Sequence, residues 1–136
     1  MDGHQFDLEI VTPKKVTYRG VVTSFTAPGV VGGFQVLRSH APLLSSLVVG
    51  EARIIDVSGS ESRYATSGGF VEVRDNKVVM LAETAEKAEE IDVKRAEAAR
   101  DRAQKRLEEK KIETDVERAK ISLHRALNRL KVAHRI

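Results

Sequence analysis

The sequence has 136 residues, a formal net charge of +3, no cysteine and an aromatic content of 4%. The lack of cysteine excludes disulfide bonds, thiolate metal sites and cysteine nucleophiles, and the few aromatics argue against a surface on which nucleic-acid bases stack. No run approaches the ~18 consecutive apolar residues of a membrane-spanning helix, and residues 1–4 do not resemble the start of a signal peptide. We therefore expect a soluble intracellular protein that meets a membrane only through a protein partner. No metal is expected, because no two of the four histidines have metal-ligand spacing: they are His4, His40, His124 and His134.

Residues 1–84 show the short alternating runs and frequent turns of β-structure. All nine glycines and all three prolines lie before residue 70, which marks a turn-rich part of the chain. Residues 70–74 and 77–81 flank Asp75-Asn76, two residue types that tolerate positive φ in a tight hairpin. Many short strands separated by turns predict a small antiparallel β-sandwich or barrel. The other predicted strands are residues 6–10, 16–22, 23–27, 34–37, 47–49 and 52–57.

Residues 85–136 have the apolar period of two helices. The first is predicted within residues 91–111. The second begins at Thr114, because Thr114–Glu117 has the S/T-x-x-E form of a capping box. A short polar link predicts an antiparallel hairpin, and its mostly alanine stripes bury little area, so we expect a weakly held hairpin that can open. The stripes are Ala96, Ala99, Ala103 and Leu107 in the first helix and Ala119, Leu123, Ala126 and Leu130 in the second.

These patterns predict an α+β protein with a β-sandwich over residues 1–84 and a helical hairpin over residues 85–136. The charge is unevenly divided between the two parts. Residues 1–84 carry eight Lys or Arg and nine Asp or Glu, whereas residues 85–136 carry fifteen and eleven. Residues 118–136 contain six bases and no acid, which indicates an acidic or phosphorylated partner.

Six arginines form two equivalent rows on the predicted helices. Their spacing keeps each row within about 40° of arc. The rows are Arg95, Arg102 and Arg106 on the first helix, and Arg118, Arg125 and Arg129 on the second.

Nearby acids distinguish the members of these two arginine rows. Asp92 can pair with Arg95, Glu109 or less directly Glu113 with Arg106, and Asp115 with Arg118. No acid lies three or four residues from Arg102, Arg125 or Arg129. The rows are then either an ordinary solvated face or a site for an anion, whose paired oxygens suit guanidinium groups. The residue pattern alone leaves both open.

Three ordered segments resemble the epsilon subunit of bacterial F-type ATP synthases. The most specific is Ser67–Val73, which continues to Ala82–Glu86; the others are His40–Leu43 and Ile91–Ala96, the last similar to the family's I-D-x-x-R-A nucleotide motif. The similarity is collinear over nearly the whole chain, from Val11 onward.

The resemblance implies a non-catalytic regulatory subunit of the central stalk, peripheral to the cytoplasmic side of the bacterial plasma membrane. Its sandwich would contact the gamma subunit and the c-ring of a proton- or sodium-translocating complex. The folded helices would permit ATP hydrolysis. When extended along gamma, they would reach an acidic segment of a beta subunit and inhibit hydrolysis; the acid-free run from Arg118 onward has the complementary charge.

The resemblance also implies that ATP, as a regulatory ligand and not a catalytic cofactor, binds the folded hairpin. The arginines would contact phosphate oxygens, the acids would accept hydrogen bonds from base or ribose or orient Arg95, and the apolar residues would contact adenine. The matching positions are Glu86, Ile91, Asp92, Arg95, Ala96, Arg102, Arg125 and Arg129.

The chain departs from the family pattern at residues 33–39. Many members have G-E-L-G-I-L-P-G before the histidine, whereas this chain has Arg38 and Ser39 at the usual proline and glycine. Because the loop resembles the family's c-ring contact, Arg38, Ser39 and His40 are predicted rotor contacts. His40 is equally well explained as a turn residue that satisfies backbone carbonyls.

Other function classes have weaker support. There is no G-x-x-x-x-G-K-[ST] loop and no Ser/His/Asp set, so we expect nucleotide binding without hydrolysis and no catalytic residue. Glu86, Glu89 and Glu90 could form an acid/base pair, but acids before a helix N-terminus are favourable without any catalysis. A structural rotor subunit with immobile helices is an alternative. A nucleic-acid-binding domain with a basic tail is another, and the acids within residues 86–117 argue against it.

Overall fold

The computed structural model describes residues 4–109 and 113–134. The chain divides into two compact units, Met1–Lys87 and Ala88–Ile136. The sequence placed this boundary three residues earlier, after Thr84. The difference is the short strand β7 (Ala85–Lys87), which pairs with β5 and so belongs to the first unit.

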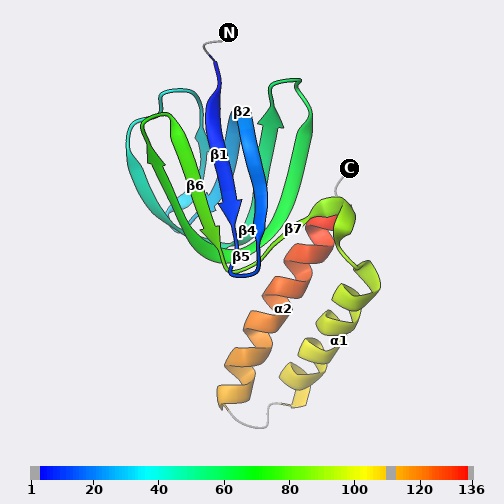
Figure 1. Cartoon of the computed structure of the whole chain (residues 1–136). Helices are drawn as coiled ribbons and strands as arrows, with labels where there is room; N and C mark the ends of the chain where they lie inside the picture. Colours follow the sequence, from blue (N-terminus) through cyan, green and yellow to red (C-terminus); the bar gives the residue numbers. More distant parts are fainter. Residues whose placement is uncertain (1–3, 110–112, 135–136) are drawn as a thin grey trace. The chain divides into compact units, whose positions relative to one another are not determined.

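The first unit is a seven-stranded sheet that closes on itself into a flattened sandwich (Figure 1). Neighbouring strands follow the order β1-β6-β5-β4-β2-β3, and β1 also pairs with β2. The predicted antiparallel sandwich is thus confirmed, with the exception that β1 and β6 run parallel. The strands are β1 (Phe6–Val11), β2 (Val16–Gly29), β3 (Gly32–Val36), β4 (Leu43–Asp56), β5 (Glu61–Arg74), β6 (Lys77–Ala82) and β7.

Three strands are longer than the sequence pattern predicted. Strands β2, β4 and β5 each have 14 residues, so that the separate runs predicted at 16–22 and 23–27, and at 47–49 and 52–57, are continuous. The pairing of β2 with β4 shifts register at two places. Such bulges bend a strand and let it continue, which breaks the period-two pattern on which the prediction relied.

The predicted hairpin turn between β5 and β6 is confirmed. Asp75 and Asn76 have φ values of 52° and 60°, the left-handed conformation that both central residues of a tight two-residue hairpin require. The turn between β4 and β5 is closed by Asp56, whose Oδ1 accepts hydrogen bonds from the Ser58 hydroxyl at 2.7 Å and the Ser60 amide at 3.0 Å. These bonds hold the pKa of Asp56 below its ordinary value.

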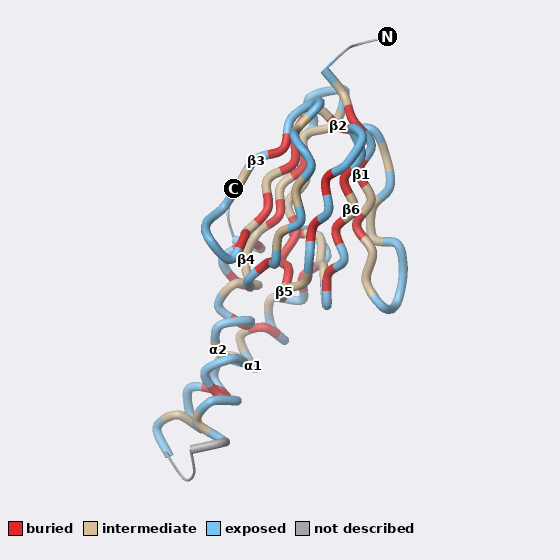
Figure 2. The backbone as a smooth tube through the Cα atoms, turned by 90° about the vertical axis from the view of Figure 1, so that its left-hand side faces the viewer, coloured by how far each residue is buried: buried red, intermediate tan, exposed pale blue. Residues whose placement is uncertain are grey.

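The core of the first unit lies between its layers, and its buried residues come from strands β1 to β6, with Ala85 of β7 packed against them. Figure 2 shows buried positions recurring along the strands. Alternation places one face of each strand inside, and this burial is the main source of stability. The core residues are Phe6, Leu8, Ile10, Val22, Phe25, Ala27, Val36, Leu47, Ala52, Ile54, Tyr64, Val71, Val73, Val78, Met80 and Ala82.

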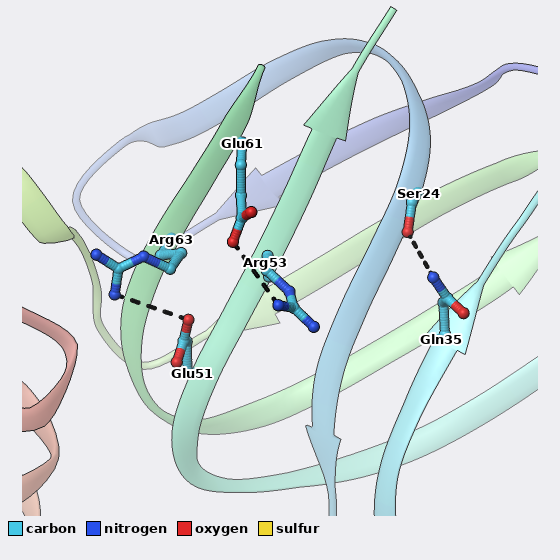
Figure 3. A network of polar contacts seen from close by, with 6 residues as sticks. All are labelled: Ser24, Gln35, Glu51, Arg53, Glu61 and Arg63. Atoms are coloured by element: carbon cyan, nitrogen blue, oxygen red, sulfur yellow. Dashed lines mark hydrogen bonds and ion pairs between the residues drawn. The ribbon is translucent and has the colours of Figure 1, made fainter. Parts of the chain in front are cut away.

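Strands β4 and β5 also carry cross-strand ion pairs (Figure 3). Arg53 and Arg63 lie directly opposite each other, an arrangement that would be unfavourable for two like charges alone. Each arginine is paired with an acid: Arg53 Nη1 lies 3.7 Å from Glu61 Oε1, and Arg63 Nη1 lies 3.9 Å from Glu51 Oε1. The four charges therefore offset one another and help to fix the register of the two strands.

The second unit contains a short 3-10 helix, η1 (Ala88–Glu90), and two antiparallel helices, α1 (Val93–Glu109) and α2 (Glu113–His134) (Figure 1). The backbone amide of Arg95 donates to Asp92 Oδ1 at 3.1 Å, so Asp92 caps α1. Helix α2 begins one residue before Thr114. The side chain of Thr114 lies outside the described residues, and the capping box remains a prediction.

The two helices pack through alanine, as predicted. Four alanines are at most 2% exposed and form the alanine interface: Ala96 and Ala103 from α1, and Ala119 and Ala126 from α2. Leu107 and Leu123 are only half-buried. Small facing side chains permit a close approach of the helix axes but bury little apolar area, so the interface is weak in proportion to its length.

Candidate functional site

The two arginine rows lie on the same face of the helical hairpin. On each helix a buried alanine directly follows an arginine of the row, so the row lies roughly 90° around the helix axis from the alanines. When two antiparallel helices face each other, equal displacements of this kind bring both rows to one side. The hairpin therefore presents Arg95, Arg102 and Arg106 from α1 beside Arg118, Arg125 and Arg129 from α2.

The rows are accessible and not part of the alanine interface. Five of the six arginines are exposed, and Arg129 is half-buried. The arginines of such a face keep their charge in contact with water, so an anion can bind there without a large desolvation cost for buried charges.

The rows meet in a hollow between the C-terminal end of α1 and the N-terminal end of α2. The hollow has a volume of about 390 Å³ and is lined by Arg106 and Glu109 from α1 and Asp115 and Arg118 from α2. Two bases and two acids share this space, so its charge is balanced. Only Arg106 and Arg118 of the two rows line the hollow, and the other four row members lie outside it: Arg95, Arg102, Arg125 and Arg129.

The other predicted nucleotide residues differ in position. Ala96 is completely buried in the alanine interface, and Ile91 is 7% exposed. Asp92 is exposed and caps α1. Glu86 is half-buried on strand β7 of the sandwich unit, where it lies opposite Ala65. Seven of the eight predicted residues thus belong to the helical unit, and five of these seven are open to solvent at least in part.

The predicted rotor loop follows β3. Arg38 and Ser39 are exposed, whereas His40 is half-buried. His40 Nδ1 lies 2.7 Å from the Ala41 carbonyl oxygen, which matches the turn role considered for this histidine. Its backbone amide donates to the Leu37 carbonyl at 3.3 Å and closes the turn.

A surface feature that the sequence pattern did not reveal crosses the outside of the sandwich. The outer apolar strip consists of Val11, Val16, Val30, Phe70 and Leu81. Phe70 pairs with Leu81, and Leu81 with Val11, which in turn lies opposite Val16. On the other side, Phe70 lies opposite Ser46, whose carbonyl accepts the Val30 amide. These residues come from four parts of the chain and meet only through strand register, so no local pattern could identify them.

The strip is strongly exposed for an apolar surface. Phe70, Leu81 and Val30 are 53%, 54% and 57% exposed. Beside them is a groove of about 370 Å³, lined by Val11, Thr12, Pro13, Gly69, Phe70, Leu81, Ala82 and Glu83. Contiguous exposed apolar area on a folded domain is typical of a protein-binding surface.

Two further properties concern the described residues. Within residues 4–109 and 113–134, no group of three or more histidines or acids is placed to hold a metal ion. None of the helices in this part of the chain is long and apolar enough to cross a membrane.

The two units correspond to two domains of known proteins. The beta-sandwich domain of the ATP synthase delta/epsilon chain matches residues 5–88, and the long alpha-helix domain of the same chain matches residues 89–134. The chain is 58% identical over 126 residues to the ATP synthase epsilon chain of Pelotomaculum thermopropionicum, covering 93% of each protein. It is 49% identical over 137 residues to that of Salinibacter ruber, covering 95% of this chain and 92% of the relative.

Solved structures show the same fold. A chain of the Euglena gracilis mitochondrial ATP synthase, solved with OSCP, F1 and c-ring, has a TM-score of 0.79 at 24% identity, covering 88% of this chain and 76% of that one. A chain of the Tetrahymena thermophila central stalk and c-ring has a TM-score of 0.58 at 19% identity, covering 93% and 95%.

The sequence and both units therefore define a delta/epsilon-type subunit of an ATP synthase. More narrowly, the chain belongs to the ATP synthase epsilon chain family, which confirms the resemblance. As a member of this family it is a non-catalytic subunit.

Proposed function

We propose that the protein is a regulatory subunit of the central stalk whose helical hairpin binds ATP in its folded state. The observation that carries this proposal is the placement of both arginine rows on one accessible face of an alanine-packed hairpin. Guanidinium groups from two helices can bind the separate oxygens of one polyphosphate. A ligand that bridges both helices binds the folded hairpin more tightly than the open one.

Arg102, Arg125 and Arg129 are assigned to the phosphates, because they lie on the shared arginine face outside the charge-balanced hollow. Asp92 and Glu86 accept hydrogen bonds from the base or ribose. The buried Ala96 acts indirectly in this scheme: its small side chain lets the helices approach so that the rows lie within reach of one ligand. The site binds ATP without hydrolysing it.

The regulatory step is a shift between two states of the hairpin. ATP at a hundred times its dissociation constant stabilises the folded state by ~2.7 kcal/mol, which changes the dominant state when the two differ by less than that. At low ATP the helices extend along the gamma subunit. The acid-free segment from Arg118 onward then contacts an acidic segment of a beta subunit on the cytoplasmic side of the membrane and inhibits hydrolysis.

Substitution of Arg125 tests the ATP site. Arg125→Ala removes a cation from the exposed face without touching the alanine interface, so we expect about a tenfold or greater loss of ATP affinity by isothermal titration and an unchanged fold by circular dichroism. The matched control is Arg100→Ala. Arg100 is on α1 outside the row and pairs with Asp101 at 3.1 Å, so its loss leaves ATP affinity unchanged.

Two results would contradict this assignment in different ways. If the full chain shows no heat with millimolar ATP, the ATP-sensing part of the proposal fails. If the chain binds ATP and Arg125→Ala binds equally well, Arg125 contacts a protein partner and not the nucleotide.

The sandwich is assigned to the rotor. One similar chain comes from an assembly with F1 and the c-ring, and another from a central stalk with the c-ring. The outer apolar strip supplies a surface of the kind that protein partners cover. We assign the strip to the gamma subunit and the loop Arg38–His40 to the c-ring. Burial of the exposed half of Phe70 and Leu81 would contribute about 2 kcal/mol or more to association.

A charge placed in the strip tests the gamma contact. Phe70→Asp is expected to weaken binding to the isolated gamma subunit by about tenfold or more, because an unpaired carboxylate would be buried at the interface. Val57→Asp is the control, since Val57 is 59% exposed and lies at the β4–β5 turn outside the strip. Equal gamma affinities for the two variants, measured by surface plasmon resonance, would remove the strip from the proposal.

A further inference from the structure

The amide side chain of Asn76 joins three segments that are distant in the sequence. Its Oδ1 accepts the Ser39 backbone amide at 2.7 Å, and its Nδ2 donates to the Gln5 carbonyl at 3.0 Å. Its own backbone carbonyl accepts the Asp7 amide at 3.3 Å. One residue of the β5–β6 turn therefore binds both the loop after β3 and the start of β1.

The loop that Asn76 contacts has an unfavourable backbone conformation. Ser39 has a φ of 56° and is the third residue of the turn that the hydrogen bond from His40 to Leu37 closes. Glycine is preferred at such a position because a Cβ disfavours positive φ. Serine gives the turn no intrinsic stability in this form, so contacts from outside the loop must hold it.

We infer that Asn76 is the positioning residue of the rotor loop. It holds Ser39 in the left-handed conformation and thereby fixes the direction in which Arg38 and His40 are presented. The inference rests on the proposed contact between this loop and the c-ring. In this role Asn76 acts through Ser39.

The Asn76→Gly variant separates the side-chain role of Asn76 from its backbone role in the β5–β6 turn. Glycine adopts the φ of 60° found here without strain, so the β5–β6 hairpin is kept while both side-chain hydrogen bonds are lost. We expect the Ser39 amide to exchange its hydrogen about tenfold faster in the full chain, as measured by NMR. If the loop then adopts its bound form only a fifth of the time, affinity for the γ–c-ring rotor complex falls about fivefold.

Two further variants are matched to this one. Asp75→Gly changes the neighbouring turn residue, which has a φ of 52°, and should leave Ser39 exchange and rotor affinity as in the parent. Asn76→Asp keeps an oxygen for the Ser39 amide and should restore slow exchange and most of the rotor affinity. If Ser39 exchanges equally fast in Asn76→Gly and Asp75→Gly, the positioning role is refuted.

The double variant Arg38→Ala/His40→Ala distinguishes failure of the proposed rotor contact from failure of the positioning role. If this double variant binds the rotor like the parent, the loop is not a rotor contact and the proposed function fails at that point, whatever Ser39 exchange shows. If the double variant binds weakly but Asn76→Gly binds like the parent, the rotor contact stands and the positioning role is overturned.

Discussion

Replacement of Gly69 by alanine is expected to destabilise the sandwich by about 3 kcal/mol or more. Gly69 has a φ of +133°, and a Cβ built on it would lie 1.9 Å from the Leu81 carbonyl oxygen and 2.9 Å from its carbon. Both atoms are backbone of the paired strand β6 and cannot turn aside as a side chain could. The substitution therefore adds a steric clash to conformational strain, and the two strands must separate locally.

Gly32→Ala is a matched control for this effect. Gly32 has the same φ of +133°, but nothing lies within 4 Å of the position of its Cβ. It should lose only the conformational part, about 1–3 kcal/mol. Urea unfolding of both variants measures the difference. If both substitutions lower the free energy of unfolding equally, the close approach of Gly69 to Leu81 does not contribute to the loss of stability.

The place of Gly69 in the fold explains why its replacement affects more than one strand. At Gly68 and Gly69, strand β5 passes from pairing with β6 to pairing with β7. The Glu83 amide donates to the Gly68 carbonyl at 3.1 Å, and the Ser67 amide to the Thr84 carbonyl at 3.3 Å. Disruption here also displaces Phe70 and Leu81, so Gly69→Ala should weaken gamma binding together with stability.

The sequence pattern predicted the elements that depend only on neighbouring residues in the chain. Asp75-Asn76 needs only its own preference for positive φ to form a hairpin, and the alanine stripes need only the helical period. The full lengths of β2 and β4 were not predictable, because they depend on bulges formed against partner strands. The parallel pairing of β1 with β6 is likewise a tertiary property that no short segment encodes.

The same distinction applies to the candidate sites. The arginine rows could be predicted from spacing alone, and the antiparallel hairpin then determines that they share a face. The outer apolar strip depends on register between β1, β4, β5 and β6, where a shift of one residue would turn Phe70 and Leu81 inward. The hydrogen bond from the Ser39 amide to Asn76 joins residues 37 positions apart, and neither residue type predicts it.

Ala103→Leu is the second substitution with a large expected effect, and it acts on the hairpin. Ala103 is 2% exposed in the alanine interface, where a larger side chain forces the helices apart at a cost of about 1–3 kcal/mol. The folded hairpin has little buried area with which to offset this cost. We expect faster hydrogen exchange throughout α1 and α2, with exchange in the sandwich strands unchanged.

Because ATP is proposed to bind only the folded hairpin, the same substitution should raise the apparent dissociation constant for ATP. Each 1.4 kcal/mol by which the substitution destabilises the folded hairpin raises this constant by a factor of ten once the open state dominates. Gln104→Leu is the control: Gln104 is exposed on the same helix and lies about half a turn from the arginine row, so leucine there perturbs neither packing nor ATP binding. If Ala103→Leu loosens the helices yet binds ATP like the parent, the ligand does not require both arginine rows, and ATP could not then act as the signal that keeps the helices folded.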